Sequence, residues 1–276
     1  MGVTKKSFGK SPEGKDVFLY ELKNENGVAA SVTDFGAILV SVMVPDKNKK
    51  LTDVVLGYDT VEGYYENKPH FGSPIGRNGN RIGGAKFIIN GKEYVLAQND
   101  NKNNLHSGPD FYRTRVWDVE EVKEQENSIT FRIFSPDGDQ GFPGNFTGYV
   151  TYKLTDDNEL VMHYTGSADA DTVVNMTNHS YFNLAGHNAG AESMLNHVVQ
   201  IHAPEFTPVS DSEAIPTGEI LKVEGTPMDF TSPKKIGQDV EADYEQLIFG
   251  GGYDHNYALC REKGGIKEAA AAHSDE

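Results

Sequence analysis

The strongest constraint on the fold is a two-residue alternation of apolar and polar side chains that recurs along the chain. Apolar side chains occupy every second position in 129–133, in 150–154 and in 160–164. Successive side chains of a β-strand point to opposite faces of the sheet, so this pattern is typical of strands that bury one face in a core. A helix would need apolar residues three and four positions apart, and no long segment has that spacing.

Turn signals separate these runs from others of the same kind. The apolar run 38–44 ends at Pro45, and a shorter run covers 54–56. Glycine and proline, with 29 and 12 residues, interrupt the pattern throughout. The segments 58–67 and 187–195 have room for short helical turns only. Many short strands between regular turns are typical of an antiparallel sandwich or barrel.

The clearest single hairpin lies between residues 87 and 96. Two apolar runs, 87–89 and 94–96, flank Asn90 and Gly91. An Asn-Gly pair tolerates the positive φ angles of a type I′ turn, so this spacing predicts a tight hairpin. The chain shows no fixed-period repeat, no linker and no shift in composition. We therefore expect an all-β fold with a single domain over residues 1–276.

Composition narrows the classes of function. Hydrophobic residues make up 37% of the chain, the mean hydropathy is −0.52, and no stretch approaches the roughly 20 apolar residues of a membrane helix. The formal charge of −16 repels phosphate and argues against a nucleic-acid partner. The single cysteine, Cys260, excludes an internal disulfide and a paired-cysteine zinc site. No apolar segment follows the basic N-terminal residues, so we expect no signal peptide and a cytoplasmic location.

A histidine among polar and aromatic neighbours is the first candidate for chemistry. His179 lies between Asn178 and the pair Ser180-Tyr181, after a short apolar run. The unperturbed pKa of histidine, about 6.5, lets the side chain give or take a proton near neutral pH. Taken alone, the segment is better explained by a core histidine on a strand.

Three loops rich in glycine and asparagine are candidates for a binding site. In loop 76–84, Asn80 and Arg81 suit a ring of hydroxyl groups, because asparagine donates and accepts while arginine offers a fork of donors. The same loop is also explained as a turn into the next strand. Loop 101–109 contains His106, which as an isolated residue would be an ordinary turn histidine. Loop 250–257 contains Asp254.

Metal binding and serine hydrolysis find little support. An Asp-His pair at 254–255 is weak evidence for a metal or a triad. The nine histidines form no H-E-x-x-H motif or other compact ligand set. No G-x-S-x-G or phosphate-binding P-loop motif is present. We therefore expect no metal.

Five further patterns occur in order along the chain: G-R-N-G-N-R-I-G-G (76–84), N-x-N-N-L-H-S-G (101–108), F-S-P-D-G-D-Q-G-F-P-G (134–144), N-H-S-Y-F-N-L (178–184) and Y-D-H-N (253–256). Taken together and in this order, these segments resemble the aldose 1-epimerase (galactose mutarotase) family. The resemblance extends from about Phe18 to the C-terminus. It implies a large antiparallel β super-sandwich with a sugar cleft across one face, and interconversion of the α and β anomers of free hexoses such as galactose and glucose without a cofactor.

The resemblance also implies roles for individual residues. His179 corresponds to the general acid that protonates the ring oxygen, and His106 to its companion on the same side of the sugar. Asp254 corresponds to a carboxylate that accepts hydrogen bonds from sugar hydroxyls. The implied substrate-binding residues are Asn80, Arg81, His106, His179, Ser180, Tyr181 and Asp254.

The sequence departs from the family pattern near its C-terminus. The family's general base is a glutamate on a C-terminal strand, near a sugar-binding glutamine in a P-G-x-Q-x-Y-T-G-N strand, and neither motif occurs here. Glu262, Glu268 and Glu276 match no catalytic context. The sequence therefore predicts a C-terminally truncated family member that lacks its last strands. Without the base, we expect activity about 10²–10⁴-fold lower than that of a complete enzyme.

Two other functions remain open at this stage. The first is a non-catalytic carbohydrate-binding protein of the same fold. The second, a sugar-phosphate epimerase, would need several arginines to gather into a basic pocket, the candidates being Arg77, Arg81, Arg113 and Arg115. The acidic chain fits a neutral hexose better. We expect a monomer or homodimer that binds neither nucleic acid nor a membrane.

Overall fold

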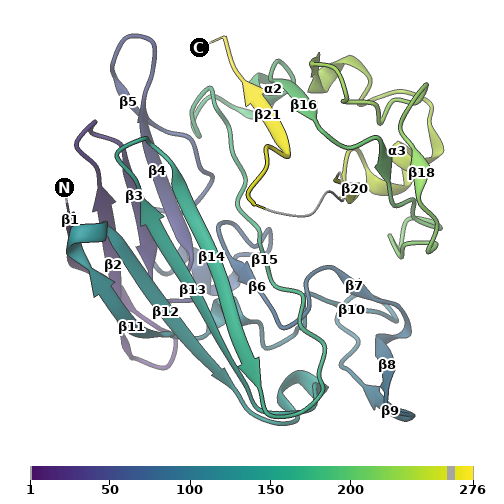
Figure 1. Cartoon of the computed structure of the whole chain (residues 1–276), viewed down its shortest axis with the longest axis horizontal. Helices are drawn as coiled ribbons and strands as arrows, with labels where there is room; N and C mark the ends of the chain where they lie inside the picture. Colours follow the sequence, from purple (N-terminus) through teal and green to yellow (C-terminus); the bar gives the residue numbers. More distant parts are fainter. Residues whose placement is uncertain (1, 260–264, 276) are drawn as a thin grey trace. The chain divides into compact units, whose positions relative to one another are not determined.

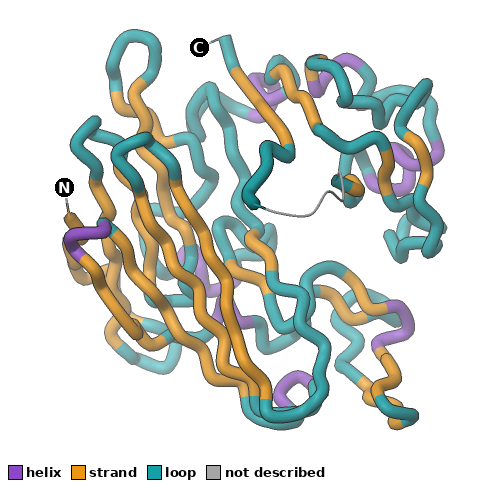
Figure 2. Tube along the Cα trace, in the orientation of Figure 1, coloured by secondary structure: helices purple, strands orange, loops and turns teal. Residues whose placement is uncertain are grey.

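Antiparallel strands make up most of the regular structure in the computed structural model of the chain, which describes residues 2–259 and 265–275 (Figure 1; Figure 2). Cys260, Glu262 and Glu276 lie outside the described residues. The internal contacts divide the chain into two compact units, Met1–Phe182 and Asn183–Glu276, and each is described by itself. The single domain expected over 1–276 stays a prediction. Among the described residues, no helix has the length and apolar character that crossing a membrane requires.

The first sheet of the unit Met1–Phe182 follows chain order. Its five strands are hydrogen-bonded as β1-β2-β3-β4-β5, each antiparallel to the next. The predicted run 38–44 is confirmed as β4. The strands are β1 (Gly2–Lys10), β2 (Asp16–Lys23), β3 (Ala29–Thr33), β4 (Leu39–Pro45) and β5 (Leu51–Asp53).

The strand predicted over 54–56 is wrong, because β5 ends before it, at Asp53. The Asp53 carboxylate accepts hydrogen bonds from the backbone N–H groups of Val42 (2.9 Å) and Val55 (3.1 Å). A side chain that takes up backbone donors in this way ends the ladder and starts a turn. Val55 then forms only an isolated bridge to Phe182.

The second sheet contains the alternating segments that the sequence analysis identified. Its strands are ordered β11-β12-β13-β14, and the last three run side by side as long strands in Figure 1. Along β13 every second residue is buried, beginning with Phe146 and ending with Leu154. The alternation is thus confirmed. The strands are β11 (Asp118–Lys123), β12 (Ser128–Ser135), β13 (Phe146–Leu154) and β14 (Leu160–Ala168).

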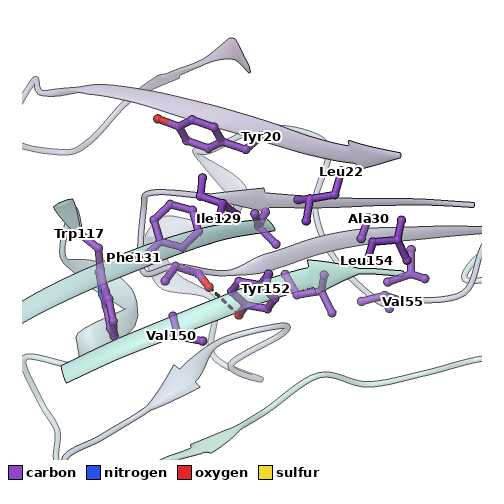
Figure 3. Close-up of a cluster of buried hydrophobic side chains, with 14 of the residues drawn as sticks. Tyr20, Leu22, Ala30, Val55, Trp117, Ile129, Phe131, Val150, Tyr152 and Leu154 are labelled. Atoms are coloured by element: carbon purple, nitrogen blue, oxygen red, sulfur yellow. Dashed lines mark hydrogen bonds between the residues drawn. The ribbon is translucent and has the colours of Figure 1, made fainter. Parts of the chain in front are cut away.

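The apolar faces of these two sheets form one core. Figure 3 shows Tyr20 and Leu22 of β2 opposite Phe131 of β12 and Tyr152 of β13. Phe131 and Tyr152 are 0% exposed, and burying a large apolar side chain stabilises a fold by about 1.5–3 kcal/mol. The Tyr152 hydroxyl donates to the Ala37 carbonyl oxygen over 2.8 Å, so the polar end of this core residue links the two sheets.

Short elements carry the loops at the candidate site. The hairpin predicted around Asn90-Gly91 is confirmed, with φ angles of 53° and 77° at the turn. The helical turn expected within 58–67 is confirmed as α1. The elements are α1 (Gly63–Glu66), β6 (Pro74–Ile75), β7 (Arg81–Ile82), η1 (Gly83–Ala85), β8 (Lys86–Ile89), β9 (Lys92–Val95), β10 (Asn104–Leu105), η2 (Tyr112–Thr114), η3 (Glu124–Glu126), η4 (Asp139–Gly141) and β15 (Thr177–Asn178).

The unit Asn183–Glu276 has its own small core around Phe206 and Leu247. Two three-stranded sheets, β19-β16-β21 and β18-β17-β20, organise it. The short turn expected within 187–195 is confirmed as α2, whereas α3 was not predicted. The elements are α2 (Ala191–Met194), β16 (Val198–Ile201), β17 (Glu205–Phe206), β18 (Leu221–Lys222), β19 (Lys234–Lys235), η5 (Ile236–Gln238), α3 (Glu245–Gly250), β20 (Tyr257–Ala258) and β21 (Ala270–His273).

Removing the hydroxyl that links the sheets should weaken the fold without changing its shape. We expect Tyr152→Phe to lower the free energy of unfolding by about 1–3 kcal/mol, because the Ala37 carbonyl loses a donor inside the core. Tyr149→Phe, on the opposite face of β13, is the matched control and should change stability by less than about 0.5 kcal/mol. Urea denaturation measures both. Equal midpoints for Tyr152→Phe and the unsubstituted chain would show that the bond contributes nothing.

Candidate active site

Three histidine rings meet in the unit Met1–Phe182. The ring centroids of His106 and His179 are 5.1 Å apart, and those of His70 lie 5.0 Å from His106 and 5.5 Å from His179. His106 directly follows β10, and His179 directly follows β15, so the structure brings two of the predicted residues together. His70, between α1 and β6, was not predicted to belong to the site.

Reciprocal hydrogen bonds with Asn80 hold His106. The backbone N–H of His106 donates to the Asn80 carbonyl oxygen over 3.0 Å, and the backbone N–H of Asn80 donates to His106 Nδ1 over 3.0 Å. An Nδ1 atom that accepts a hydrogen bond carries no proton, so the neutral ring has its proton on Nε2. His106 therefore has an N–H donor on the side of the ring away from Asn80.

His179 is held by the short pairing of β15 with β6. Its backbone N–H donates to the Ser73 carbonyl oxygen over 2.9 Å. Asn178 Oδ1 accepts the backbone N–H of Ser180 over 2.9 Å, which tightens the turn after β15. Tyr181 follows, with its ring centroid 5.3 Å from that of His179. Because the Tyr181 side chain is 42% exposed, it forms an accessible aromatic wall beside the histidines.

Arg81 is oriented by a carboxylate that the sequence analysis did not identify. Arg81 Nε donates to Asp100 Oδ2 over 2.7 Å, and both side chains are mostly buried. The Asn80 side-chain oxygen accepts the backbone N–H of Arg81 over 2.9 Å. β7 pairs with β10, which brings Arg81 opposite Leu105, the residue before His106. Arg81 thus lies on the strand paired with β10, and Asn80 directly precedes that strand.

Burial keeps His70 and His106 uncharged at neutral pH. Burial is the largest cause that lowers the pKa of His106 to about 4, followed by the positive charges of His179 and Arg81, while Asp100 acts in the opposite direction. Burial and the Arg113 guanidinium lower the pKa of His70 to about 3. Like charges within a few ångströms disfavour the protonated form of each ring. His70 and His106 are therefore neutral imidazoles near pH 7.

Arg77 supports loop 76–84 from below and has no part in phosphate binding. Its side chain is 1% exposed. Its guanidinium donates to Ser135 Oγ and to the carbonyl oxygens of Ser135, Pro136 and Pro143 at 2.8–3.1 Å. It also donates to Thr172 Oγ1 over 3.2 Å.

The other arginines also have separate partners. Arg113 donates to His70, and Arg115 pairs with Asp110 and Asp139 at 2.9 and 2.7 Å. The basic pocket that a sugar phosphate would need is therefore not formed by these side chains.

Asp254 belongs to the other unit, Asn183–Glu276. It is exposed, lies between α3 and β20, and donates its backbone N–H to the Gly252 carbonyl oxygen over 3.2 Å. Its role beside the histidines stays a prediction. In the same unit Glu268 accepts a hydrogen bond from His202 Nε2 over 2.8 Å. Among the described residues of the whole chain, no group of three or more His, Cys, Asp or Glu side chains is arranged to hold a metal ion.

Known proteins of similar sequence place the chain in a family of isomerases. The family described as aldose 1-epimerase matches residues 19–275. The galactose mutarotase of Bos taurus is 38% identical over 260 residues, which cover 94% of this chain and 72% of that protein. The aldose 1-epimerase of Escherichia coli (strain K12) is 37% identical over 261 residues, with coverages of 95% and 73%. The chain therefore belongs to the aldose 1-epimerase family.

Solved structures confirm the predicted galactose mutarotase-like β-sandwich. The crystal structure of a galactose 1-epimerase from Lactobacillus acidophilus NCFM matches with a TM-score of 0.86 and 26% identity, covering 99% of this chain and 77% of that one. An aldose epimerase homologue from C. elegans matches with a TM-score of 0.82 and 31% identity, with coverages of 92% and 74%.

The family match includes the C-terminal segment that we expected to depart from the family. It runs to residue 275, beyond the Y-D-H-N segment. The expected truncation is therefore not borne out by these comparisons. The absence of a general-base glutamate stays a prediction.

The neutral histidines should make stability depend on pH. Both residues take up protons near pH 6.5 in the unfolded chain but only near pH 3 and 4 when folded. Between these values the unfolded state binds more protons, so stability is full above about pH 6.5 and falls as the pH falls. His70→Asn should reduce the loss between pH 7 and 4 by about 1–3 kcal/mol. Urea denaturation at each pH tests this, with His163→Asn on exposed β14 as control. An unchanged loss in His70→Asn would contradict the assignment.

The carbonyl oxygens that accept hydrogen bonds from Arg77 predict a large loss of stability when this residue is replaced. We expect Arg77→Met to lower the free energy of unfolding by more than about 3 kcal/mol, because several buried carbonyl oxygens lose their donor. Arg132→Met removes the same charge from exposed ion pairs on β12 and should cost less than about 1 kcal/mol. Thermal denaturation compares the two variants. A similarly small decrease in melting temperature for both variants would refute the supporting role of Arg77.

Proposed function

We propose that this chain interconverts the α and β anomers of free hexoses, galactose and glucose among them, with His179 as the general acid. The observation that carries the proposal is the approach of His106 and His179, whose ring centroids are 5.1 Å apart on loops of the same unit. Family membership supports the reaction class, since relatives are named galactose mutarotase and aldose 1-epimerase.

The reaction needs two proton movements. Opening a cyclic hemiacetal removes a proton from the anomeric hydroxyl and adds one to the ring oxygen. The aldehyde then rotates about its bond to the next carbon, and closure on the other face inverts the anomeric centre. A positioned acid or base typically contributes about 10²–10⁴-fold to such a step. No metal or redox group is needed for this sequence of events.

His179 and His106 have different roles at the ring oxygen. His179 delivers the proton, and His106 donates a hydrogen bond from Nε2–H to the same side of the sugar. The neutral state of His106 supports this division, because burial and neighbouring charges lower its pKa to about 4. A second cation beside His179 would raise the cost of protonating it.

Sugar hydroxyls are bound by the groups around the histidines. The guanidinium of Arg81, oriented by Asp100, donates to hydroxyl oxygens, and Asn80 lies beside it on the same loop. Tyr181 supplies the accessible aromatic wall, and Ser180 lies between Tyr181 and His179. The family resemblance further implies that Asp254 accepts hydrogen bonds from sugar hydroxyls. Pockets for polar rings combine such convergent polar groups with an apolar wall.

The remaining expectations also belong to the proposal. The general base that the family resemblance implies has no counterpart motif among the 276 residues, so the chain should work more slowly than a mutarotase that has one. We propose a cytoplasmic enzyme, monomeric or homodimeric, that acts on a neutral sugar.

Polarimetry of freshly dissolved α-D-galactose tests the assignment of His179. We expect His179→Asn to lower the enzymatic rate about 10²–10⁴-fold, since the general acid is removed. His163→Asn, an exposed histidine of β14, is the control and should retain the rate of the unsubstituted chain. A full rate in His179→Asn would remove this residue from the mechanism. Calorimetric binding of galactose without any rate enhancement would instead indicate a non-catalytic sugar-binding protein.

A further inference from the structure

A buried pair, Arg113 and His70, contacts the two proposed catalytic histidines through the ring of His70. Arg113 is 6% exposed and His70 is 8% exposed. Arg113 Nε donates a hydrogen bond to His70 Nδ1 over 3.0 Å. Arg113 belongs to η2, and His70 to the loop between α1 and β6, so two separate segments meet in this contact.

The contact determines where the His70 ring carries its proton. A guanidinium group is a donor only and stays protonated, so His70 Nδ1 must be the acceptor. The ring proton is therefore on Nε2. Protonating Nδ1 would break the bond to Arg113 and place two cations against each other in a buried site.

The ring of His70 has a defined orientation against both other histidines. Its plane is inclined by 68° to His106 and by 39° to His179. Phe111 packs edge-on against its remaining side, with centroids 4.9 Å apart. The loop itself is closed by the buried Asn67, whose side chain bonds the backbone N–H and carbonyl oxygen of Phe71. His70 is thus held from three directions.

Positive charge outweighs negative charge around these rings. The groups that act on His106 are His179, Arg81 and Arg113, which oppose its protonation, and Asp100, which favours it. Those that act on His70 are Arg113, His106 and His179, all of which oppose protonation. Arg113 Nη1 is buried and has no hydrogen-bond partner among residues 2–259 and 265–275. The field of this cation is therefore weakly screened.

We propose that Arg113 and His70 are positioning residues that keep His106 uncharged and leave His179 as the histidine that carries the catalytic proton. The Arg113 charge opposes protonation of His70, which it contacts directly, and with a smaller effect that of His106. We call this difference, with neutral His70 and His106 and a proton-carrying His179, the partition of charge. Its catalytic purpose rests on the proposed function, but the protonation states themselves can be measured without sugar or turnover.

A purely structural role would give different results. If Arg113 only filled space, a methionine of similar length would replace it without altering protonation. If its charge matters, Arg113→Met should raise the pKa of His70 most and that of His106 less, whereas Arg113→Lys should leave both nearly unchanged. Arg132→Met removes an equal charge from the exposed side of β12 and serves as the control.

Nitrogen-15 NMR of the histidine rings, recorded without sugar, is the direct test. In the unsubstituted chain we expect His70 and His106 as Nε2–H tautomers that do not titrate between pH 8 and about 5. In Arg113→Met we expect both pKa values to rise from about 3 and about 4, with the larger rise at His70. If His70 of the unsubstituted chain carries its proton on Nδ1, or titrates near pH 6.5, the proposal is overturned whether or not any variant folds.

The pH dependence of turnover tests whether this partition of charge matters for catalysis. By polarimetry, the acidic limb of the kcat/KM profile should move to higher pH in Arg113→Met and stay in place in Arg113→Lys. A profile of Arg113→Met that superimposes on that of the unsubstituted chain overturns the catalytic purpose. Inactive protein with the expected NMR shifts would refute the proposed function and leave the partition of charge intact.

Discussion

The burial of Arg77 is the constraint on which the candidate site depends. A cation that is 1% exposed is tolerated because Ser135, Pro136 and Pro143 direct carbonyl oxygens at it. Breaking such a set of bonds would leave both the charge and its acceptors unsatisfied, which is costly inside a protein. The backbone on either side of Arg77 is therefore anchored to the end of β12 and to the loop that follows it. Loop 76–84 starts from this fixed point.

Hydrogen bonds to the backbone on either side of Arg77 fix the positions of His106 and His179. Three residues further along, Asn80 exchanges two hydrogen bonds with His106, and Ser73 on the preceding segment accepts the N–H of His179. The sandwich beneath contributes rigidity, since β12 is buried against the opposite sheet. Short backbone pairings between loops thus place side chains for chemistry, whereas the long strands supply the scaffold.

The fold was predictable wherever the signal is local. The alternation in β12 and β13 and the Asn90-Gly91 turn depend on neighbouring residues only, and both are confirmed. The strand expected at 54–56 failed because the Asp53 side chain binds backbone donors and ends the sheet. Propensity does not reveal that competition.

The candidate site was predictable in part. The family motifs pointed to His106 and His179, and the structure brings these two together. His70, Arg113 and Asp100 were missed because each matters through a contact between distant segments, and nothing in their immediate sequence marks it. His70 lies only a few residues before loop 76–84, but a histidine before a loop has many ordinary explanations. Asp254 remains a prediction from resemblance.

The central claim is that His106 and His179 act as one unit on the ring oxygen of a hexose. Exchange NMR of α- and β-galactose at equilibrium gives the interconversion rate for His106→Asn, for His179→Asn and for the double variant. If the residues act together, the double variant should lose little more rate than the more damaged single variant, because groups that serve one step are strongly non-additive. Rate losses that multiply independently, or a double variant that retains the full exchange rate, would contradict the account.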